Sequence, residues 1–556
     1  MEQLRYQKND WIRAVFALSA GFFSLLTSRY YEKVVIVLAF LMVAVAFFFL
    51  DRRYTLSKFP SFDRVSVWIF TVVSLYLVYR YYLFCVNVDY LTDWKTNGLW
   101  VWIFRLAALL SLPFVFFMTN RVGGFLLERG KRLWKESTAW DKGIFFAVVL
   151  SSFALSFVLC SLTSVFTNPQ TEGFVNPNSG THEVWFDVLF TSDSGHLYVR
   201  DAFWNPSCTQ NDIRQPFFAL LSLPFSLVAD AVSLLPFQDS FGAALLAEQM
   251  ICVYCSGLLM AGMLNLKGFS KYAFVFFYCS VAGNFLFAFI LEQYAFSVFY
   301  LLLGVSCIVQ KRREGALLIP FAAGGLATTV LMAPMATEAY GYRKSFQEGM
   351  ISLLTGCLKM AGIFLLIMAL FGQLTQLAPA RLAASIKELV QFTGEKVAFF
   401  DIFCQYTHFV ANLFSIPALR IATESLIWEA SVPSLQLNVP TSVSVIGIVL
   451  FVEAVLAFVC CRKERFAGIC AYWILCSLAI LLVLGWGAQE NGMILYSMYF
   501  AWAFVGLFAS LIKKVCRGNE IALGALFAGL GLLFFVTNLL SMIEIVRFGM
   551  EYYPVQ

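Results

Sequence analysis

Residues 143–166 read GIFFAVVLSSFALSFVLCSLTSVF, a run of 24 residues without a charged side chain. A helix needs about 20 apolar residues to cross the hydrocarbon core of a bilayer. Similar runs recur along the chain, at 11–27, 33–50, 65–86, 98–119, 243–266, 272–290, 292–309, 317–335, 349–372, 441–460, 467–486, 492–512 and 520–541. We therefore predict an all-α polytopic membrane protein with about 12–14 transmembrane helices.

The composition of the whole chain supports the same class. Of 556 residues, 60% are hydrophobic, 17% are aromatic and only 13% are charged, and the mean hydropathy is +0.76. Soluble domains carry about 25% charged residues, so a water-soluble enzyme is excluded. Disordered chains have low hydrophobicity and high charge, so a disordered chain is excluded as well. The net charge of +5 is small. The sequence has no basic patch interleaved with aromatic residues, so nucleic-acid binding is not predicted.

The basic residues suggest how the chain is oriented and divided. Residues 131–142 are predicted to form a cytoplasmic basic linker, because short cytoplasmic loops are rich in Lys and Arg. Residues 1–130 precede it as an accessory transmembrane module. A core at 143–372 follows, with an outer loop at 167–242, then an outer or interfacial polar segment at 373–440 and C-terminal transmembrane helices at 441–556. The basic groups at 267–271, 311–313 and 462–465 are also expected to be cytoplasmic.

The densest group of polar residues lies in the outer loop. Residues 167–215 contain no Lys but two of the three histidines, His182 and His196, and six acids: Glu172, Glu183, Asp187, Asp193, Asp201 and Asp212. In a helix, Asp193, His196 and Arg200 would share one face, because they are spaced three and four residues apart. A carboxylate beside an imidazole and a guanidinium suits deprotonation of a hydroxyl and binding of an anionic leaving group. The alternative is a solvated loop whose polar residues cap helices.

Two further polar groups interrupt apolar runs. Glu292, Gln293 and Tyr294 follow the run at 272–290 and begin the run at 292–309. Glu490 and Asn491 separate the runs at 467–486 and 492–512. Each group is either a ligand-binding position or an ordinary turn, since burying an ionisable residue in a membrane is costly and often functional. Lone charges inside apolar runs, such as Glu248, are interpreted as internally paired or interfacial.

This layout resembles the GT-C superfamily of polytopic glycosyltransferases. The resemblance rests on Asp193 with His196 near the start of the outer loop and on Ile213-Arg-Gln-Pro-Phe-Phe218 before a surface helix at 217–237. Gln215 stands where a His is common. The resemblance implies sugar transfer from a polyprenyl-phosphate donor to an acceptor hydroxyl, with Asp193 as general base and His196 assisting it. Residues implied in binding the substrate or its phosphate are Arg200, Asp201, Asp212, Arg214, Glu292, Gln293, Tyr294, Glu490 and Asn491.

The sequence and this resemblance also indicate the expected ligands and location. No ligand spacing predicts a metal site, although the loop carboxylates are groups that a divalent cation accepts. The expected partners are membrane lipid, the lipid-linked sugar donor and an acceptor. The expected location is a bacterial plasma membrane, with the site on the extracytoplasmic face. Two alternatives stay open, which are a transporter or flippase for a lipid-linked saccharide and a polymerase or ligase of envelope polysaccharide.

Overall fold

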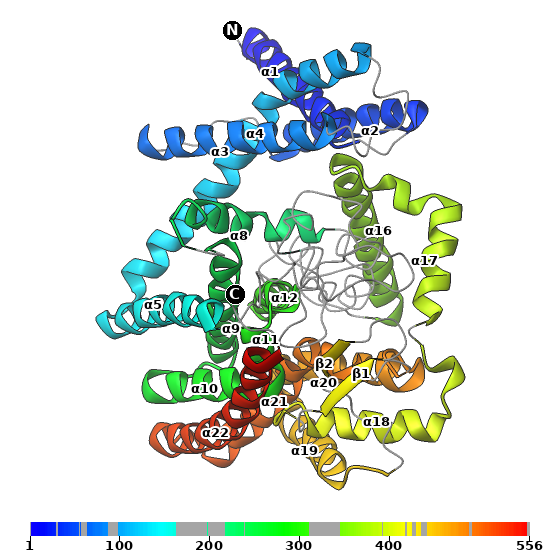
Figure 1. Cartoon of the computed structure of the whole chain (residues 1–556). Helices are drawn as coiled ribbons and strands as arrows, with labels where there is room; N and C mark the ends of the chain where they lie inside the picture. The colour runs from blue at the N-terminus through cyan, green and yellow to red at the C-terminus, as the bar shows by residue number, and fades with distance from the viewer. Residues whose placement is uncertain are drawn as a thin grey trace. The chain divides into compact units, whose positions relative to one another are not determined.

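The computed structural model describes residues 2–28, 32–54, 56, 64–86, 98–162, 197, 217–237, 240–310, 345–391, 393–416, 420–424, 430–434, 442–488 and 492–552. The chain divides into two compact units (Figure 1). The first consists of residues 1–146, 204–219 and 357–383, and the second of residues 147–203, 220–356 and 384–556.

The prediction of an all-α polytopic membrane protein is confirmed. In the described part of the chain, 9 helices are long and apolar enough to cross a membrane, or up to 10 if the bent pair α10 (Gly268–Ser280) and α11 (Ala282–Phe289) forms one span. Shorter apolar helices include α8 (Phe218–Val232), α12 (Tyr294–Val309) and α19 (Val445–Cys461). The predicted span at 317–335 lies outside the described residues.

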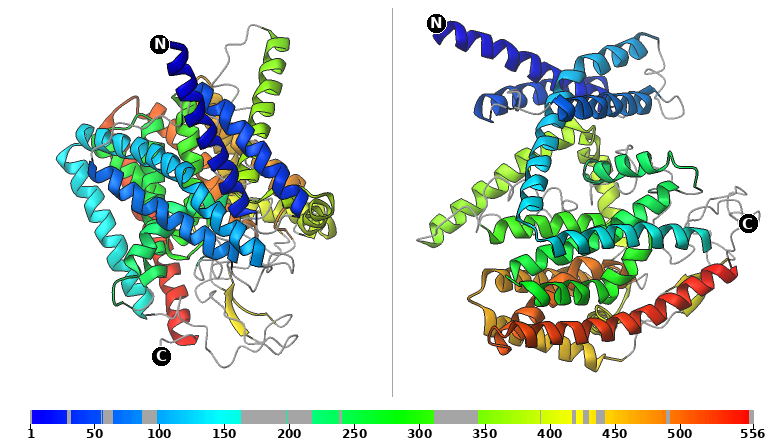
Figure 2. Two further views of the ribbon diagram at one scale, coloured as in Figure 1. Left: turned by 90° about the horizontal axis from the view of Figure 1, so that it is seen from above. Right: turned by 90° about the vertical axis from the view of Figure 1, so that its left-hand side faces the viewer.

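The first unit is built on four N-terminal helices: α1 (Glu2–Thr27), α2 (Lys33–Tyr54), α3 (Arg64–Val86) and α4 (Gly98–Glu136). Figure 2 shows α1, α2 and α4 packed side by side. Phe16 is at the centre of this packing, with its ring in contact with the rings of Phe47, Phe114 and Phe117. Such aromatic pairs stabilise a bundle beyond the area that they bury.

A proline in the middle of α4 is accommodated by a serine from α1. Pro113 cannot donate a hydrogen bond and disturbs the turn that precedes it. The hydroxyl of Ser19 lies in this turn, accepting from the N–H of Phe114 at 2.9 Å and donating to the carbonyl of Leu110 at 2.7 Å. Ser19 therefore replaces the hydrogen bond that the helix would otherwise make between these two residues.

The first unit also includes the end of helix α16 (Phe346–Leu370), so it extends beyond the predicted module at 1–130. The hydroxyls of Ser24 and Thr27 each donate at 2.7 Å to carbonyls of its last turn, those of Ala369 and Leu370. The last carbonyls of a helix have no partner within the helix, so these hydroxyls satisfy groups that would otherwise be buried unpaired. This pairing places residues 357–383 in the unit of α1.

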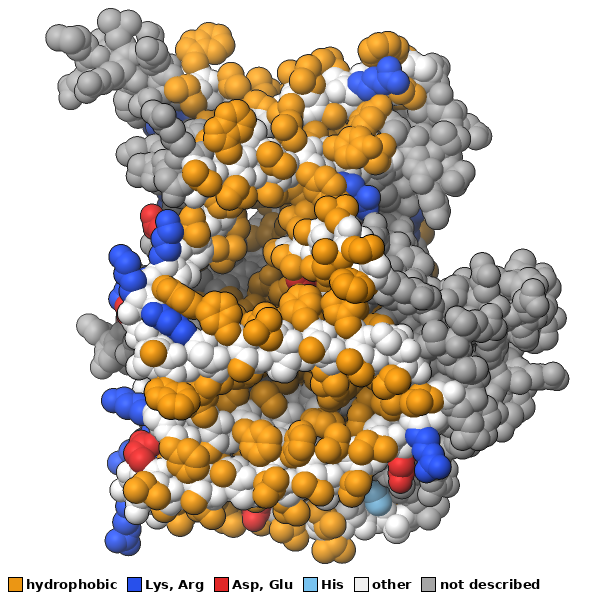
Figure 3. All heavy atoms as spheres, turned by 60° about the vertical axis from the view of Figure 1, so that its left-hand side comes forward, with side chains coloured by type: hydrophobic (Ala, Val, Ile, Leu, Met, Phe, Trp, Pro, Cys, Tyr) orange, Lys and Arg blue, Asp and Glu red, His pale blue; other side chains and the backbone are white. Residues whose placement is uncertain are grey.

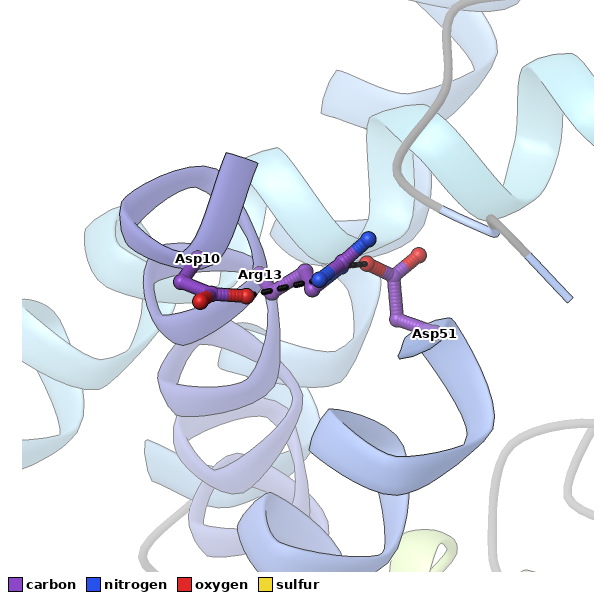
Figure 4. A network of polar contacts seen from close by, with 3 residues as sticks. All are labelled: Asp10, Arg13 and Asp51. Carbon is purple, nitrogen blue, oxygen red and sulfur yellow. Dashed lines mark hydrogen bonds and ion pairs between the residues drawn. The ribbon is translucent and has the colours of Figure 1, made fainter. Parts of the chain in front are cut away.

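A charged network links α1 to the end of α2 (Figure 4). The guanidinium of Arg13 lies 2.6 Å from the carboxylate of Asp10 and 3.6 Å from that of Asp51. The Asp51 side chain is fully buried, whereas 45% of the Asp10 side chain is exposed. A buried carboxylate needs a cation close by, and Arg13 supplies it.

The predicted linker at 131–142 is almost entirely helical. Helix α4 continues to Glu136, and only Ser137 and Thr138 separate it from α5 (Ala139–Leu162). Arg132 and Glu136 form an ion pair of 2.7 Å that supports the end of α4. Thr138 and Asp141 cap α5 reciprocally, since each accepts a hydrogen bond from the backbone N–H of the other.

The second unit surrounds helix α9 (Ser240–Met263), which is buried over most of its length. The helix α12 packs against α9, and α10 runs beside α22 (Glu520–Tyr552), as Figures 1 and 2 show. Two further helices, α20 (Arg465–Ser477) and α21 (Ser497–Val515), pack on each other and contribute the buried Trp473 and Trp502. In the lower half of Figure 3, hydrophobic side chains cover the middle of the helices and most of the visible basic ones lie at their left-hand ends.

The polar segment predicted at 373–440 contains α17 (Pro379–Gln391), α18 (Phe399–Ala411) and a small β-hairpin. The strands β1 (Arg420–Glu424) and β2 (Ala430–Ser434) pair antiparallel, with Arg420 opposite Ser434. This hairpin is the only sheet in the described part of an otherwise helical protein. Pro433 lies on a strand of a two-stranded sheet, where both strands are edges and a missing N–H is tolerated.

Candidate functional site

Most of the residues predicted to form the site lie outside the described residues. These are Asp193, His196, Arg200, Asp201, Asp212, Arg214, Glu490 and Asn491. The structure describes Glu292, Gln293 and Tyr294, which lie together between α11 and α12. These three residues are the described part of the predicted site.

Glu292 is an acid that is built into the interior of the second unit. Only 2% of its surface is exposed. Its backbone N–H donates to the side-chain oxygen of Gln249 on α9 at 2.8 Å, and its carboxylate accepts from the N–H of Gln293 at 2.9 Å. Both its backbone and its side chain are thus held in place, as a ligand-binding group requires.

Gln249 stabilises the whole connection between α11 and α12. Its side-chain N–H₂ donates to the carbonyl of Phe287 at 2.9 Å and to that of Ile290 at 2.8 Å. With the N–H of Glu292, one fully buried amide satisfies three backbone groups that no helix pairs. Non-helical backbone at membrane depth is stable only where protein satisfies its polar groups in this way.

The two neighbours of Glu292 differ in their surroundings. The ring of Tyr294 is buried between Phe287, at 5.1 Å between centroids, and Tyr499 of α21, at 5.5 Å. The side-chain oxygen of Gln293 is buried without a hydrogen-bond partner among the described residues. Tyr294 therefore fixes the start of α12, and Gln293 keeps an unused acceptor next to Glu292.

A second break lies between α10 and α11, which meet at Val281 with an angle of 70°. Asn538 on α22 donates to the carbonyls of Ser280, at 2.7 Å, and Phe414, at 3.0 Å. Its side-chain oxygen accepts from the N–H of Ile416 at 2.8 Å. The carbonyl of Phe414 also accepts from the N–H of Ala282 at 3.2 Å, so the break is as fully hydrogen-bonded as the one at Glu292.

Glu248 is a second buried carboxyl, next to Gln249 in the sequence. It is 6% exposed, and its Oε2 has no hydrogen-bond partner among the described residues. The interpretation of Glu248 as internally paired is not supported for this oxygen. Sequence reasoning also missed Gln249 and Asn538, whose only signal is that each is a polar residue in an apolar run.

The depth of this group follows from helix geometry. Gln249 lies 14 residues before Met263, the last residue of α9. At 1.5 Å of rise per residue, the group lies about 21 Å from that end of the helix. Gln249 lies 9 residues after Ser240, the first residue of α9, so the group lies nearer the Ser240 end of this helix.

The described ranges contain no group of three or more His, Cys, Asp or Glu that could hold a metal ion. The group around Glu292 instead offers a carboxylate and amide oxygens, which suit hydroxyl groups of a polar ligand. No family model, curated protein or solved structure matches the chain.

Proposed function

We propose that the protein is an integral-membrane glycosyltransferase that moves a sugar from a polyprenyl-phosphate donor to an acceptor hydroxyl at the outer membrane face. The observation that carries the proposal is Glu292, a carboxylate held rigidly inside a membrane bundle. It lies beside the amide oxygen of Gln293, which has no hydrogen-bond partner in the described part of the chain. Rigid acceptors of this kind suit the hydroxyls of a sugar, and intramembrane acids are costly unless they function.

The reaction assigns one role to each candidate group. Asp193 removes the proton of the acceptor hydroxyl, with His196 assisting. The acceptor oxygen then bonds to the anomeric carbon while the bond from that carbon to the phosphate oxygen breaks, with inversion. Arg200 and Arg214 hold the departing polyprenyl phosphate, because guanidinium groups bind phosphate in two-point contacts.

Binding of the sugar would involve the remaining candidates. Asp201 and Asp212, with Glu490 and Asn491, provide oxygen and amide groups for sugar hydroxyls. Glu292 would bind the sugar and not the phosphate, since two negative charges repel each other. Analysis of the reaction products would identify the sugar and the acceptor.

The test is a turnover assay in nanodiscs with a panel of short-chain polyprenyl-phosphate sugars and membrane extract as acceptor, with released polyprenyl phosphate quantified. Wild type should release it, and Asp193→Asn should lower kcat about a hundredfold to ten-thousandfold, as loss of a general base does. Glu292→Gln should raise KM. The control Glu544→Gln, at an exposed position of α22, should behave as wild type. A fully active, folded Asp193→Asn variant would disprove the proposed role of this residue.

A transporter for a lipid-linked saccharide is the second candidate. The discontinuous pair α10–α11 and the polar side chains along α9 favour it, because many transporters bind substrates beside broken helices near the membrane midplane. A transporter makes no glycosidic bond. Uptake of a lipid-linked saccharide by proteoliposomes without any new product would therefore select this candidate over the transferase.

A further inference from the structure

Three turns of the second unit lie together at one end of its helices. They connect α9 with α10, α19 with α20, and α21 with α22. The ammonium of Lys513 donates to the carbonyl of Leu264 at 2.6 Å, and the ammonium of Lys514 donates to the carbonyl of Cys460. The hydroxyl of Ser270 donates to the carboxylate of Glu520. These three contacts join the turns into one surface, which we call the basic rim.

The basic rim has a strong positive charge. It carries two acids, Glu464 and Glu520, against eight basic residues, which are Lys267, Lys271, Arg462, Lys463, Arg465, Lys513, Lys514 and Arg517. The excess is therefore six positive charges. This exceeds the net charge of +5 of the whole chain, so the rest of the protein is close to neutral.

Two kinds of cation can be separated within the rim. Lys513 and Lys514 lie at the ends of α9 and α19, where a cation is stabilised by the last helix carbonyls. Lys267, Arg462, Lys463 and Arg517 are exposed instead, and none of them forms an ion pair with another described residue. Of the other six basic residues, Lys271 and Arg465 are half-buried, so the four exposed cations are the ones best placed to face an anion.

Large apolar side chains lie directly beside these cations. Phe269 is 59% exposed two residues after Lys267, and Val515 and Ile521, on either side of Arg517, are 70% and 78% exposed. A soluble polyanion would not cover apolar side chains. A lipid would, because its phosphate pairs with the cation while its acyl chain contacts the apolar neighbour.

We propose that the basic rim is a binding site for the phosphate-bearing headgroups of anionic membrane lipids. The cations Lys267, Arg462, Lys463 and Arg517 bind the headgroups, and Phe269, Val515 and Ile521 contact the acyl chains. The rim then lies at the cytoplasmic face, in agreement with the bias of Lys and Arg toward that side. This site is independent of the proposed transferase activity.

The test measures lipid binding to the full chain in detergent by native mass spectrometry. The probes are dioleoyl phosphatidylglycerol, dioleoyl phosphatidylcholine and inorganic phosphate. The test variant combines Lys463→Gln with Arg517→Asn, since Arg517 has a φ of 51° and Asn tolerates this conformation. The control combines Lys387→Gln with Lys396→Gln, which removes the same charge from exposed positions of α17 and the turn that follows it.

Wild type should bind phosphatidylglycerol more tightly than phosphatidylcholine, and millimolar phosphate should not displace it. Each basic residue near a headgroup contributes about fivefold in affinity, so the test variant should bind phosphatidylglycerol about thirtyfold more weakly. The control should bind as wild type does. The proposal is overturned if the test variant keeps wild-type affinity, if the control loses as much, or if phosphate displaces the lipid.

Discussion

The side-chain oxygen of Gln249 accepts the backbone N–H of Glu292 at 2.8 Å, across 43 residues of sequence. Gln249 belongs to a long buried helix and Glu292 to the short connection between α11 and α12. This contact fixes an acid in the interior of the second unit by means of a neutral amide. The position of Glu292 therefore depends on a residue that has no charge and takes no part in the proposed chemistry.

Replacing Gln249 by Leu should destabilise the protein. Two carbonyls and one N–H would lose their buried partner, at a cost of about 1–3 kcal/mol in the free energy of unfolding. Thermal unfolding in detergent measures the change. Gln310→Ala is the matched control, because Gln310 is exposed and, among the described residues, its amide donates only to the hydroxyl of Ser306 one turn earlier. Equal stability of Gln249→Leu and wild type would show that these hydrogen bonds do not hold the connection.

Asn538→Ala should have a similar effect at the break between α10 and α11. The carbonyl of Ser280 and the N–H of Ile416 would lose the partner that Asn538 provides, and the carbonyl of Phe414 would keep only the N–H of Ala282. The expected cost is again about 1–3 kcal/mol. The neighbour Thr537 is exposed, and its only hydrogen bonds to residues that the structure describes are within its own helix. Thr537→Ala should therefore leave the unfolding temperature unchanged. Indistinguishable unfolding temperatures for the two variants would contradict this prediction.

Gly283→Ala tests the close packing of α11 on α21. A methyl group at Gly283 would lie 2.6 Å from the hydroxyl oxygen of Ser497 and 3.2 Å from the backbone nitrogen of Met498. Such overpacking costs about 1–3 kcal/mol. A methyl group at Gly468 meets nothing within 4 Å, so Gly468→Ala should keep or raise stability because Ala favours helix. Thermal unfolding of both variants measures the difference, and Gly283→Ala should unfold at the lower temperature. A Gly283→Ala variant as stable as Gly468→Ala would rule out the tight contact.

Asp51→Ala should destabilise the first unit by about 2–3 kcal/mol, because Arg13 would lose a carboxylate in a buried setting. Glu136→Ala removes a similar pair with Arg132, but both of these side chains are more than half exposed. Exposed pairs contribute less than about 1 kcal/mol. Urea unfolding of the two variants side by side measures the difference. An equal loss of unfolding free energy in Glu136→Ala and Asp51→Ala would contradict this prediction.

The sequence predicts the helices of this protein well, because a membrane helix must be apolar along its whole length. The apolar run at 243–266 corresponds to α9, and the run at 98–119 lies within α4. The bend at Val281 was not predicted, since no proline marks it within the apolar run at 272–290. Its hydrogen bonds come from Asn538 and Phe414, which are distant in the sequence, so local patterns do not contain them.

Less of the candidate site could be predicted. Glu292 was identified because it interrupts apolar runs, but its partner Gln249 was not, because one amide in an apolar helix looks like many others. The basic residues of the linker at 131–142 predict its orientation but not its secondary structure. The pair Arg132–Glu136 and the cap formed by Thr138 and Asp141 are local signals that favour helix there.

The role of Asn538 has a consequence for how the protein is made. The chain is synthesised from its N-terminus, and Asn538 follows Ser280 by 258 residues and Phe414 by 124. At about 5–20 residues per second, α10 and α11 wait about 13–50 s for the helix that completes their hydrogen bonds. Until α22 arrives, the bent backbone at Val281 lacks these partners. Insertion factors that shield polar backbone would therefore be needed at this bend until α22 is made, and a nascent chain truncated before α22 should be a form that cellular proteases remove.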